Sequence, residues 1–570
     1  MDKPEFHFLG DSAILATFSR TISEEINDLV LWVSATLEGM CLPGVSEVQP
    51  AYSSLCVHFD PSQIRGSYLV DLIERIAEKA KPPEDQTGRP GQVVEIQVVY
   101  GGENGPDLDW ACNHLGIPRE ELIRRHSERL YRVFMVGFTP GFPYLGGMDE
   151  TIALPRLPEP RKLVPAGSVG IAGKQTGIYP WDSPGGWRII GRTSAELFSP
   201  YRDPPSLLKP GDYVRFVPVS GNEWFPAHGN AERTGLLPDK DTPGRHLPRG
   251  PELTGSLRTE ASVLGRLTGT ELPGLAIEDP GFLSLVVDRG RFGYRKYGVP
   301  VAGATDSRSF ALANLLCQND PGDAAIEFTL KGPSMVALTD LTVAITGAPC
   351  EVTVDGRPVP QNAPVFLRKG SKLQVGTVRA ACRGYIAVSG GIRVPVVLGS
   401  RSTYLRGKFG GFEGRHLKSG DTLCVGPAPE HVYVTRSNRA TPVPQHLFIE
   451  RLTLGETILR VLPGPEATPK SLEILSKATY TVRPDSDRMG LRLEGPAVFD
   501  AGATDILSSP VVPGTIQVAS DGRPMLLLAD GQTTGGYARI ATVISRDLPL
   551  AGQVRAGAKI RFKVLNPWQR

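Results

Sequence analysis

The segment from residue 137 to residue 193 restricts the fold more than any other part of the sequence, because glycine and proline recur throughout it. Its main strings are Gly137-Phe138-Thr139-Pro140-Gly141-Phe142-Pro143-Tyr144, Pro165-Ala166-Gly167-Ser168-Val169-Gly170 and Ser183-Pro184-Gly185-Gly186-Trp187. Glycine weakens helices and serves positions where the backbone takes a positive φ or comes close to another group. The segment therefore predicts short strands joined by tight loops, and these loops are candidates for a binding site.

Glycine-rich strings also punctuate the second half of the chain. They include Gly298-Val299-Pro300-Val301-Ala302-Gly303-Ala304-Thr305-Asp306, Leu398-Gly399-Ser400-Arg401-Ser402-Thr403-Tyr404, Ser486-Asp487-Arg488-Met489-Gly490 and Asp530-Gly531-Gln532-Thr533-Thr534-Gly535-Gly536-Tyr537. No residue-level repeat relates the two halves, although both place glycines before a Tyr or Trp.

The two sets of strings resemble two known families in a fixed order. The first set resembles allophanate hydrolase subunit 1, the family of the bacterial 5-oxoprolinase B subunit and of the Kip kinase inhibitor. The second set resembles allophanate hydrolase subunit 2, equivalently the 5-oxoprolinase C subunit, and both resemble the carboxyltransferase domain of urea amidolyase. The resemblance covers most of the chain except residues 221–280, and it implies a fusion of a B-like and a C-like half.

Length and composition predict a soluble, mainly β protein with several cores. At 570 residues the chain is too long for one core, and its formal net charge of +2 gives no electrostatic footprint for nucleic acid or an anionic membrane. Its seven cysteines are scattered without a Cys-x-x-Cys pair, and no signal peptide or long apolar run is present. We expect a cytoplasmic protein.

Hydrophobic spacing divides the chain into units. Apolar alternation predicts a strand over 6–18, and helical spacing after Ser23 predicts a helix over 23–37. The expected fold class is mainly β with α+β, with a ferredoxin-like N-terminal unit and, by resemblance, cyclophilin-like barrels in both halves. The expected units are 1–85 (small α+β), 93–220 (barrel), 221–280 (partly disordered linker), 281–440 and 441–570 (two barrel-like β lobes).

Missing motifs limit the chemistry. The chain has no Gly-x-x-x-x-Gly-Lys-Ser/Thr loop, no His-Glu-x-x-His or similar metal spacing, and no Ser-Ser-Lys amidase pattern. It also lacks a Met-Lys-Met biotinylation context, so any biotin is expected on another protein. ATP with magnesium is implied by the resemblance alone.

Candidate ligand contacts in the first half come from its glycine-rich loops. Backbone N–H groups and aromatic side chains there could line a pocket, with plain aromatic core as the alternative for the three large rings. The candidates are Tyr144, Gln175, Tyr179, Ser183, Gly185, Gly186 and Trp187. His126 is a candidate general base, because its ordinary pKa lies near neutrality, and a structural histidine is the alternative.

In the second half, Arg401 is the main catalytic candidate, because a guanidinium flanked by hydroxyls suits bidentate binding of a carboxylate or phosphate. A buried arginine that ties loops together is the alternative. Asp306 and Glu327 are candidate acid–base or magnesium-binding carboxylates, with structural hydrogen bonding equally open. Further candidates for substrate binding are Ser402, Thr403, Tyr404, Arg488 and Gln532.

Three functions follow from the resemblance. The first is the fused B–C component of ATP-dependent 5-oxoprolinase, which opens 5-oxoproline to glutamate with a separate A subunit. The second is the carboxyltransferase of a biotin-dependent urea or urea-like amide carboxylase, which needs a biotin carboxylase and carrier. The third is non-enzymatic regulation of a histidine kinase. A B–C fusion without carboxylase, carrier or amidase segments favours the first, and homo-oligomerisation stays open.

Overall fold

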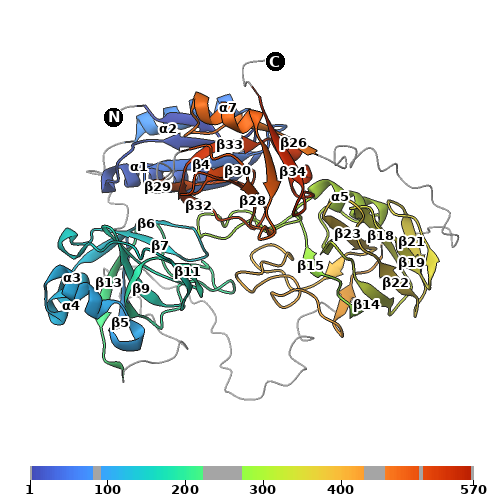
Figure 1. The fold of residues 1–570 in the computed structure, drawn as a ribbon, viewed down its shortest axis with the longest axis horizontal. Coiled ribbons are helices and arrows are strands. Elements are labelled where there is room, and N and C mark those ends of the chain that lie inside the picture. The colour runs from blue at the N-terminus through green and yellow to red at the C-terminus, as the bar shows by residue number, and fades with distance from the viewer. Residues whose placement is uncertain (1–2, 81–90, 222–271, 429–455, 500–504, 566–570) are drawn as a thin grey trace, which may run out of the picture.

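The computed structural model describes residues 3–80, 91–221, 272–428, 456–499 and 505–565, and these residues form mostly strands with few helices. Figure 1 shows four units: a small α+β unit, a barrel in the first half, a two-sheet lobe and a second barrel. None of the helices in the described ranges is long and apolar enough to cross a membrane.

The N-terminal unit is a four-stranded antiparallel sheet covered by two helices. Its elements are β1 (Glu5–Phe8), β2 (Ala13–Thr17), α1 (Glu24–Gly39), β3 (Val45–Pro50), β4 (Ser54–Phe59) and α2 (Gly66–Lys79), with sheet order β1-β2-β4-β3. The single strand predicted over 6–18 is wrong, because the chain turns back at Gly10, whose φ is +68°. The ferredoxin-like order is not confirmed, since two strands precede each helix.

Side-chain alternation gives this sheet two buried faces. Ile14 packs toward both helices, together with Leu55 and Val57 of the neighbouring strand. The alternate residues, including Leu15 and Cys56, pack instead against Val512 of the C-terminal unit. The sheet therefore lies between its own helices and the second half of the chain.

The first-half barrel is closed by seven strands. They are β5 (Val93–Tyr100), β6 (Leu130–Val136), β7 (Pro143–Gly146), β9 (Ser168–Ala172), β10 (Gln175–Ile178), β12 (Arg188–Arg192) and β13 (Tyr213–Pro218), in the order β10-β7-β6-β13-β5-β12-β9. A separate ribbon pairs β8 (Arg161–Val164) with β11 (Ser183–Gly185), and α3 (Leu108–Leu115) and α4 (Arg119–Ser127) cover one side. The predicted barrel and its many short strands are confirmed.

The first lobe of the second half is made of two packed sheets rather than a closed barrel. The seven-stranded sheet contains β14 (Leu272–Asp279), β17 (Ser334–Ala337), β19 (Val352–Val354), β20 (Arg357–Pro358), β22 (Lys372–Val375), β24 (Ile392–Arg393) and β25 (Thr422–Val425). The five-stranded sheet contains β15 (Leu283–Val287), β16 (Ala325–Thr329), β18 (Leu341–Gly347), β21 (Pro364–Leu367) and β23 (Arg383–Val388), and α5 (Ser307–Leu316) packs on its outer face. Strand β14 occupies the end of the predicted linker, whose remainder lies outside the described residues.

The C-terminal unit is the second closed barrel. Its strands are β26 (Glu456–Pro463), β27 (Thr479–Val482), β28 (Gly490–Glu494), β30 (Thr515–Val518), β31 (Pro524–Leu527), β33 (Arg539–Val543) and β34 (Lys559–Val564). Helices α7 (Pro469–Lys477) and α8 (Leu548–Ala551) flank it, and a ribbon pairs β29 (Asp505–Pro510) with β32 (Thr534–Tyr537).

The two barrels have the same topology. In each, the first and last strands are parallel neighbours, β5 with β13 and β26 with β34, and the remaining strands follow in the same cyclic order. The ribbons β8–β11 and β29–β32 also occupy equivalent places. In each half, the first ribbon strand comes between the third and fourth barrel strands along the chain, and the second comes between the fifth and sixth. The glycine pairs before Trp187 and Tyr537 are therefore topologically equivalent.

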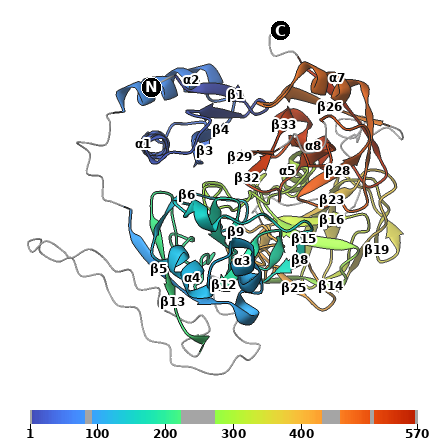
Figure 2. The ribbon, with the colours of Figure 1, turned by 60° about the vertical axis from the view of Figure 1, so that its left-hand side comes forward.

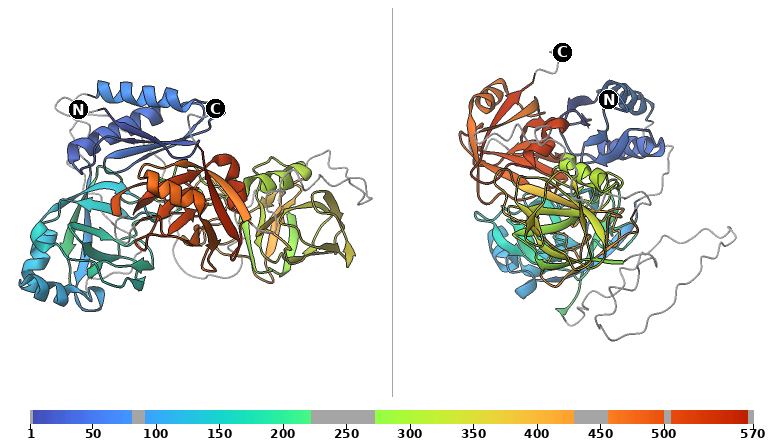
Figure 3. Two further views of the ribbon diagram at one scale, coloured as in Figure 1. Left: turned by 45° about the horizontal axis from the view of Figure 1, so that its top comes forward. Right: turned by 90° about the vertical axis from the view of Figure 1, so that its right-hand side faces the viewer.

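The two halves pack together rather than standing apart. Figures 2 and 3 show the second barrel beside the N-terminal unit, with the first barrel below both. Buried Glu47 pairs with buried Arg295 at 3.1 Å, and the Gln49 side chain donates to the Thr533 carbonyl at 2.9 Å. These contacts fix one half on the other at several points.

Candidate functional site at the junction of the two halves

Aromatic rings from the first-half motifs form one cluster against the second half. Phe142 lies edge-on to Tyr144, Tyr179 and Trp187, at centroid distances of 5.1, 5.8 and 5.9 Å. Tyr52 of the N-terminal unit and Leu507 of the second barrel pack against the same cluster. The rings predicted to line a pocket are thus brought together, but as a largely buried core.

The other first-half candidates surround this cluster. Gln175 donates from Nε2 to the Tyr52 hydroxyl at 2.7 Å, and Ser183 and Gly185 lie in the ribbon strand β11. A Cβ at Gly185 would lie 2.5 Å from the Tyr179 hydroxyl, so close backbone approach explains that glycine, whereas Gly186 would meet only Pro160 at 3.7 Å. Burial raises the pKa of Tyr179 to about 12, so this phenol stays protonated at neutral pH.

The first-half motif meets the last motif of the second half at this junction. A Cβ on Gly137 would lie 2.5 Å from Thr534 Oγ1, so only glycine fits there beside Thr534. Burial raises the pKa of Tyr144, although the neighbouring hydroxyls of Thr534 and Ser508 lower it in part. Two motifs that are far apart in sequence therefore share one contact surface.

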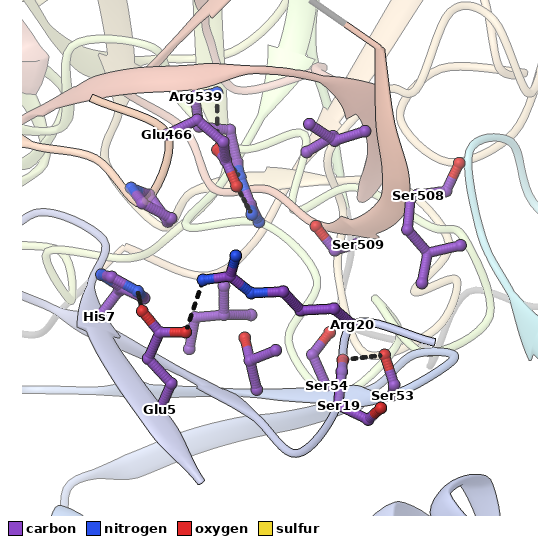
Figure 4. Close-up of a pocket in the computed structure, with 15 residues that line it drawn as sticks. Glu5, His7, Ser19, Arg20, Ser53, Ser54, Glu466, Ser508, Ser509 and Arg539 are labelled. Carbon is purple, nitrogen blue, oxygen red and sulfur yellow. Dashed lines mark hydrogen bonds and ion pairs between the residues drawn. The ribbon is translucent and has the colours of Figure 1, made fainter. Parts of the chain in front are cut away.

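A polar cavity of about 360 Å³ lies next to this junction, between the N-terminal sheet and the second barrel (Figure 4). Two arginine–glutamate pairs face it, Arg20 with Glu5 and Arg539 with Glu466, and His7 donates from Nε2 to the Glu5 carboxylate at 3.0 Å. Five serines also line the cavity, namely Ser19, Ser53, Ser54, Ser508 and Ser509.

Three buried polar atoms at the boundary of the two halves, one of them in the cavity wall, have no hydrogen-bond partner in the part of the chain that the structure describes. They are Gln49 Oε1, Thr533 Oγ1 and Ser509 Oγ. Unpaired buried polar groups are rare in proteins and often mark a site that binds water or a ligand. Their gathering at the boundary of the two halves makes this boundary the candidate site.

A second polar centre joins the two-sheet lobe to the second barrel. Arg488 forms a bidentate pair with Asp530, at 3.1 and 2.9 Å, and also binds Glu327 and the Thr305 hydroxyl. The Tyr385 hydroxyl donates to Glu327 at 2.7 Å. Burial acts to raise the pKa of Glu327, but Arg488 and Arg383 outweigh it and leave the pKa below its ordinary value. Two sequence candidates, Glu327 and Arg488, therefore meet in a fully buried network.

Asp306 lies beside this network as the N-cap of α5. Its carboxylate accepts from the backbone N–H groups of Arg308 and Ser309 and from the side chains of Ser309 and Gln553. Burial raises the pKa of Asp306 against these hydrogen bonds. The geometry matches the structural alternative, because its acceptor capacity is used within the protein.

Arg401 lies in a loop that is organised by a carboxylate absent from the sequence candidates. Asp288 accepts from the Ser400 hydroxyl at 2.6 Å, the Ser402 hydroxyl at 2.8 Å and the Arg401 backbone N–H at 2.5 Å. The Arg401 side chain donates from Nε to the Val394 carbonyl at 3.1 Å. Thr403 donates to the Val286 carbonyl, and Tyr404 is buried in an adjacent apolar cluster.

The last two candidates, His126 and Gln532, are not among the residues that line the cavity. His126 is fully buried in the first barrel, where its ring nitrogens bond Tyr100 and Thr176 at 2.8 Å each. Burial lowers the pKa of His126 to about 3, which matches the structural alternative rather than a general base. Gln532 donates to Gln517 at 3.0 Å within the second barrel.

The sequence motifs missed four residues that line the cavity, because none of them belongs to a glycine-rich string. They are Arg20, Glu466, Ser509 and Arg539.

The described ranges contain no group of three His, Cys, Asp or Glu side chains placed to hold a metal ion.

The sequence matches two family models that together span most of the chain. Residues 297–564 match the carboxyltransferase domain, subdomain A and B, and residues 4–208 match the carboxyltransferase domain, subdomain C and D. The 5-oxoprolinase B subunit of Bacillus subtilis is 44% identical over 227 residues, which cover 38% of this chain and 93% of that protein.

The second half has its own relatives. The 5-oxoprolinase C subunit of Escherichia coli K12 is 36% identical over 291 residues, which cover 50% of this chain and 90% of that protein. The urea amidolyase of Saccharomyces cerevisiae is 35% identical over 316 residues, which cover 52% of this chain but 17% of the amidolyase. The crystal structure of TTHA0988 matches with a TM-score of 0.78 at 35% identity, covering 97% of this chain and 99% of that one.

Proposed function

Because the chain belongs to the carboxyltransferase-domain family that includes the B and C subunits of 5-oxoprolinase, we propose that it is the fused B–C component of an ATP-dependent 5-oxoprolinase. In this role it activates 5-oxoproline for ring opening to glutamate together with a separate A subunit. The observation that carries the proposal is the nearly full-length match to a B subunit and to a C subunit, in that order, within one chain.

The junction of the two halves supports this proposal, because both halves contribute to it. Ser53 and Ser54 come from the B-like half, and Ser508 and Ser509 from the C-like half. Opening a lactam develops negative charge on the lactam oxygen, and hydrogen-bond donors held in place around that oxygen stabilise such charge. ATP enters the proposal through the family alone, and no step is assigned to a metal ion.

A carboxyltransferase role is the second candidate, and the match to urea amidolyase favours it. In that case the carboxyl group would arrive on biotin carried by another protein, and the same hydroxyl-lined junction would hold urea or a similar amide. The acceptor would again develop negative charge on a carbonyl oxygen, so the chemistry of the wall does not separate the two reactions. Their co-substrates do separate them.

The test is a reconstitution with purified proteins. The chain together with the A subunit should hydrolyse ATP only when 5-oxoproline is present and should form glutamate, while the chain alone should form none. Urea-dependent ATP hydrolysis with a biotin carboxylase and carrier, and none with the A subunit, would instead establish the carboxyltransferase role. Robust glutamate formation by the chain alone would contradict the need for a partner.

A further inference from the structure

We propose that the cavity between the N-terminal sheet and the second barrel binds a small molecule that has both a carboxylate and an amide N–H. Arg20 and Ser509 would hold the carboxylate, and Glu466 would accept the N–H. The site location rests on the cavity and its wall, whereas the choice of 5-oxoproline as its ligand rests on the proposed function.

Arg20 is the cation that can bind a ligand anion without breaking the fold. Its pair with Glu5 is long, at 3.4 Å, and the Arg20 side chain is 87% exposed. Figure 4 shows this side chain reaching across the cavity toward Glu5. Exposed pairs of this kind contribute little to stability, so an incoming carboxylate can replace Glu5 at little cost.

Arg539 plays a different part on the opposite wall. Its side chain is 4% exposed, and it donates to Glu466 through Nε at 3.0 Å and Nη2 at 2.6 Å and to the Pro510 carbonyl through Nη1 at 2.9 Å. The Arg539 side chain therefore uses its hydrogen-bond donors to hold Glu466 and the backbone of the cavity wall in place. It is a positioning residue for Glu466 rather than a ligand contact.

Glu466 keeps room for one more donor. A carboxylate offers about four acceptor positions, and Arg539 fills three of them with its backbone N–H, Nε and Nη2. The remaining position, on Oε1, suits an amide N–H. Because Arg539 fixes the Glu466 side chain, this acceptor is held in place before the ligand arrives.

Ser509 supplies independent evidence that the wall is built for a ligand. Its hydroxyl lines the cavity, the residue is 7% exposed, and Oγ has no hydrogen-bond partner among the described residues. Ser509 lies on β29, in the ribbon that is topologically equivalent to the β8–β11 ribbon of the first barrel. A ligand carboxylate at Arg20 would give this hydroxyl an acceptor.

The experiment measures binding of two matched lactams to the full chain by titration calorimetry. One is 5-oxoproline, and the other is 2-pyrrolidinone, which has the same ring without the carboxylate. We expect binding of 5-oxoproline only. Arg20→Gln should weaken it about 10- to 100-fold, because it removes a charged hydrogen bond, and Ser509→Ala about 2- to 10-fold.

Two control variants make the same kinds of substitution at residues outside the cavity. Arg215→Gln removes an exposed arginine that pairs with Glu95 at 3.3 Å on the first barrel, much as Arg20 pairs with Glu5. Ser389→Ala removes another buried hydroxyl without a partner in the described part of the chain, in the two-sheet lobe. Both should bind 5-oxoproline like the unmodified chain.

The site and the proposed function fail in different ways. Equal binding of 2-pyrrolidinone, no binding of 5-oxoproline, or unchanged affinity and KM in Arg20→Gln would overturn the site even if the reconstituted enzyme hydrolyses 5-oxoproline. Conversely, Arg20-dependent binding of 5-oxoproline without turnover in the presence of the A subunit would support the site and refute the proposed function.

Discussion

Replacing Arg488 with methionine should destabilise the second half strongly, because it leaves two carboxylates without their main cation. Arg488 is the hydrogen-bond partner of both Asp530 oxygens and also binds Glu327, and all three side chains are buried. Glu327 keeps Tyr385 and Thr305 as donors and Arg383 at 3.7 Å. Breaking a buried pair by removing one partner costs about 3–5 kcal/mol, and we expect Arg488→Met to reach this range.

Arg483 offers a matched control five residues earlier in the chain. It also forms a bidentate pair, with Asp485 through Nε and Nη2 at 3.0 Å each, but its side chain is 39% exposed. Arg483→Met should cost about 1 kcal/mol or less, because water can solvate both partners. The two variants therefore separate burial from pair geometry.

The loss in Arg488→Met should also depend on pH. Burial already raises the pKa of Asp530, and Arg488 counteracts that rise. Without Arg488 the folded-state pKa of Asp530 lies further above its unfolded value, so the contribution of Asp530 to stability is largest at low pH and is lost as pH rises through the folded pKa. The deficit relative to the unmodified chain should therefore be smaller at pH 5 than at pH 8.

The assay is guanidinium denaturation at both pH values, followed by circular dichroism, with hydrogen exchange of peptides covering 303–330 and 483–531. Hydrogen exchange is needed because a chain with several units need not unfold in one step. The reasoning is refuted if Arg488→Met costs no more than Arg483→Met, or if its deficit at pH 5 equals that at pH 8.

Three further predictions concern the packing of the units. Because burial lowers the pKa of His126 to about 3, stability should fall by up to about 1.4 kcal/mol per pH unit from 6.5 toward 3, and His126→Gln should remove this part of the fall in acid denaturation curves. Glu47→Gln should lower the free energy of unfolding in denaturant titrations by about 3–5 kcal/mol, because it leaves a buried inter-half arginine unpaired. Glu38→Gln, which affects an exposed inter-half pair, should lower it little. Gly137→Ala should cost about 1–3 kcal/mol through its clash with Thr534, and Thr534→Ala in the same chain should restore most of the loss in thermal melts.

Local signals in the sequence predicted several elements correctly. Ser23 caps α1 by accepting from the Ile26 backbone N–H at 3.2 Å, as the polar start and helical spacing indicated. The N-terminal hairpin was missed because alternation continues across its turn, and only Gly10 marks the reversal. For His126 the sequence leaves a general base and a structural histidine open, because the ordinary pKa of histidine applies in water and burial in the barrel core lowers it.

The candidate site was harder to predict, because its residues come together only through packing of distant units. Gln49 and Thr533, which bond across the junction, are 484 positions apart in the chain. Arg20, Glu466 and Ser509 carry no local pattern that marks them, whereas Glu327 and Arg488 belong to strings that a family resemblance brings out. Glycine-rich strings therefore mark contact surfaces between units in the sequence, whereas the cavity beside them can be recognised only in the assembled structure.

The repeated barrel topology explains why both glycine pairs stand before an aromatic residue although the halves share no visible sequence repeat. The first glycine of each pair lies in the second strand of the ribbon that leaves its barrel, Gly185 in the first half and Gly535 in the second. A Cβ at Gly185 would strike Tyr179, and one at Gly535 would lie 2.6 Å from the Gln517 amide. Close contact between the ribbon and its own barrel constrains these glycines, whereas the other strand of the second ribbon, β29, contributes Ser508 and Ser509 to the cavity. In the second half, one strand of the ribbon therefore packs on the barrel through Gly535, and the other lines the cavity.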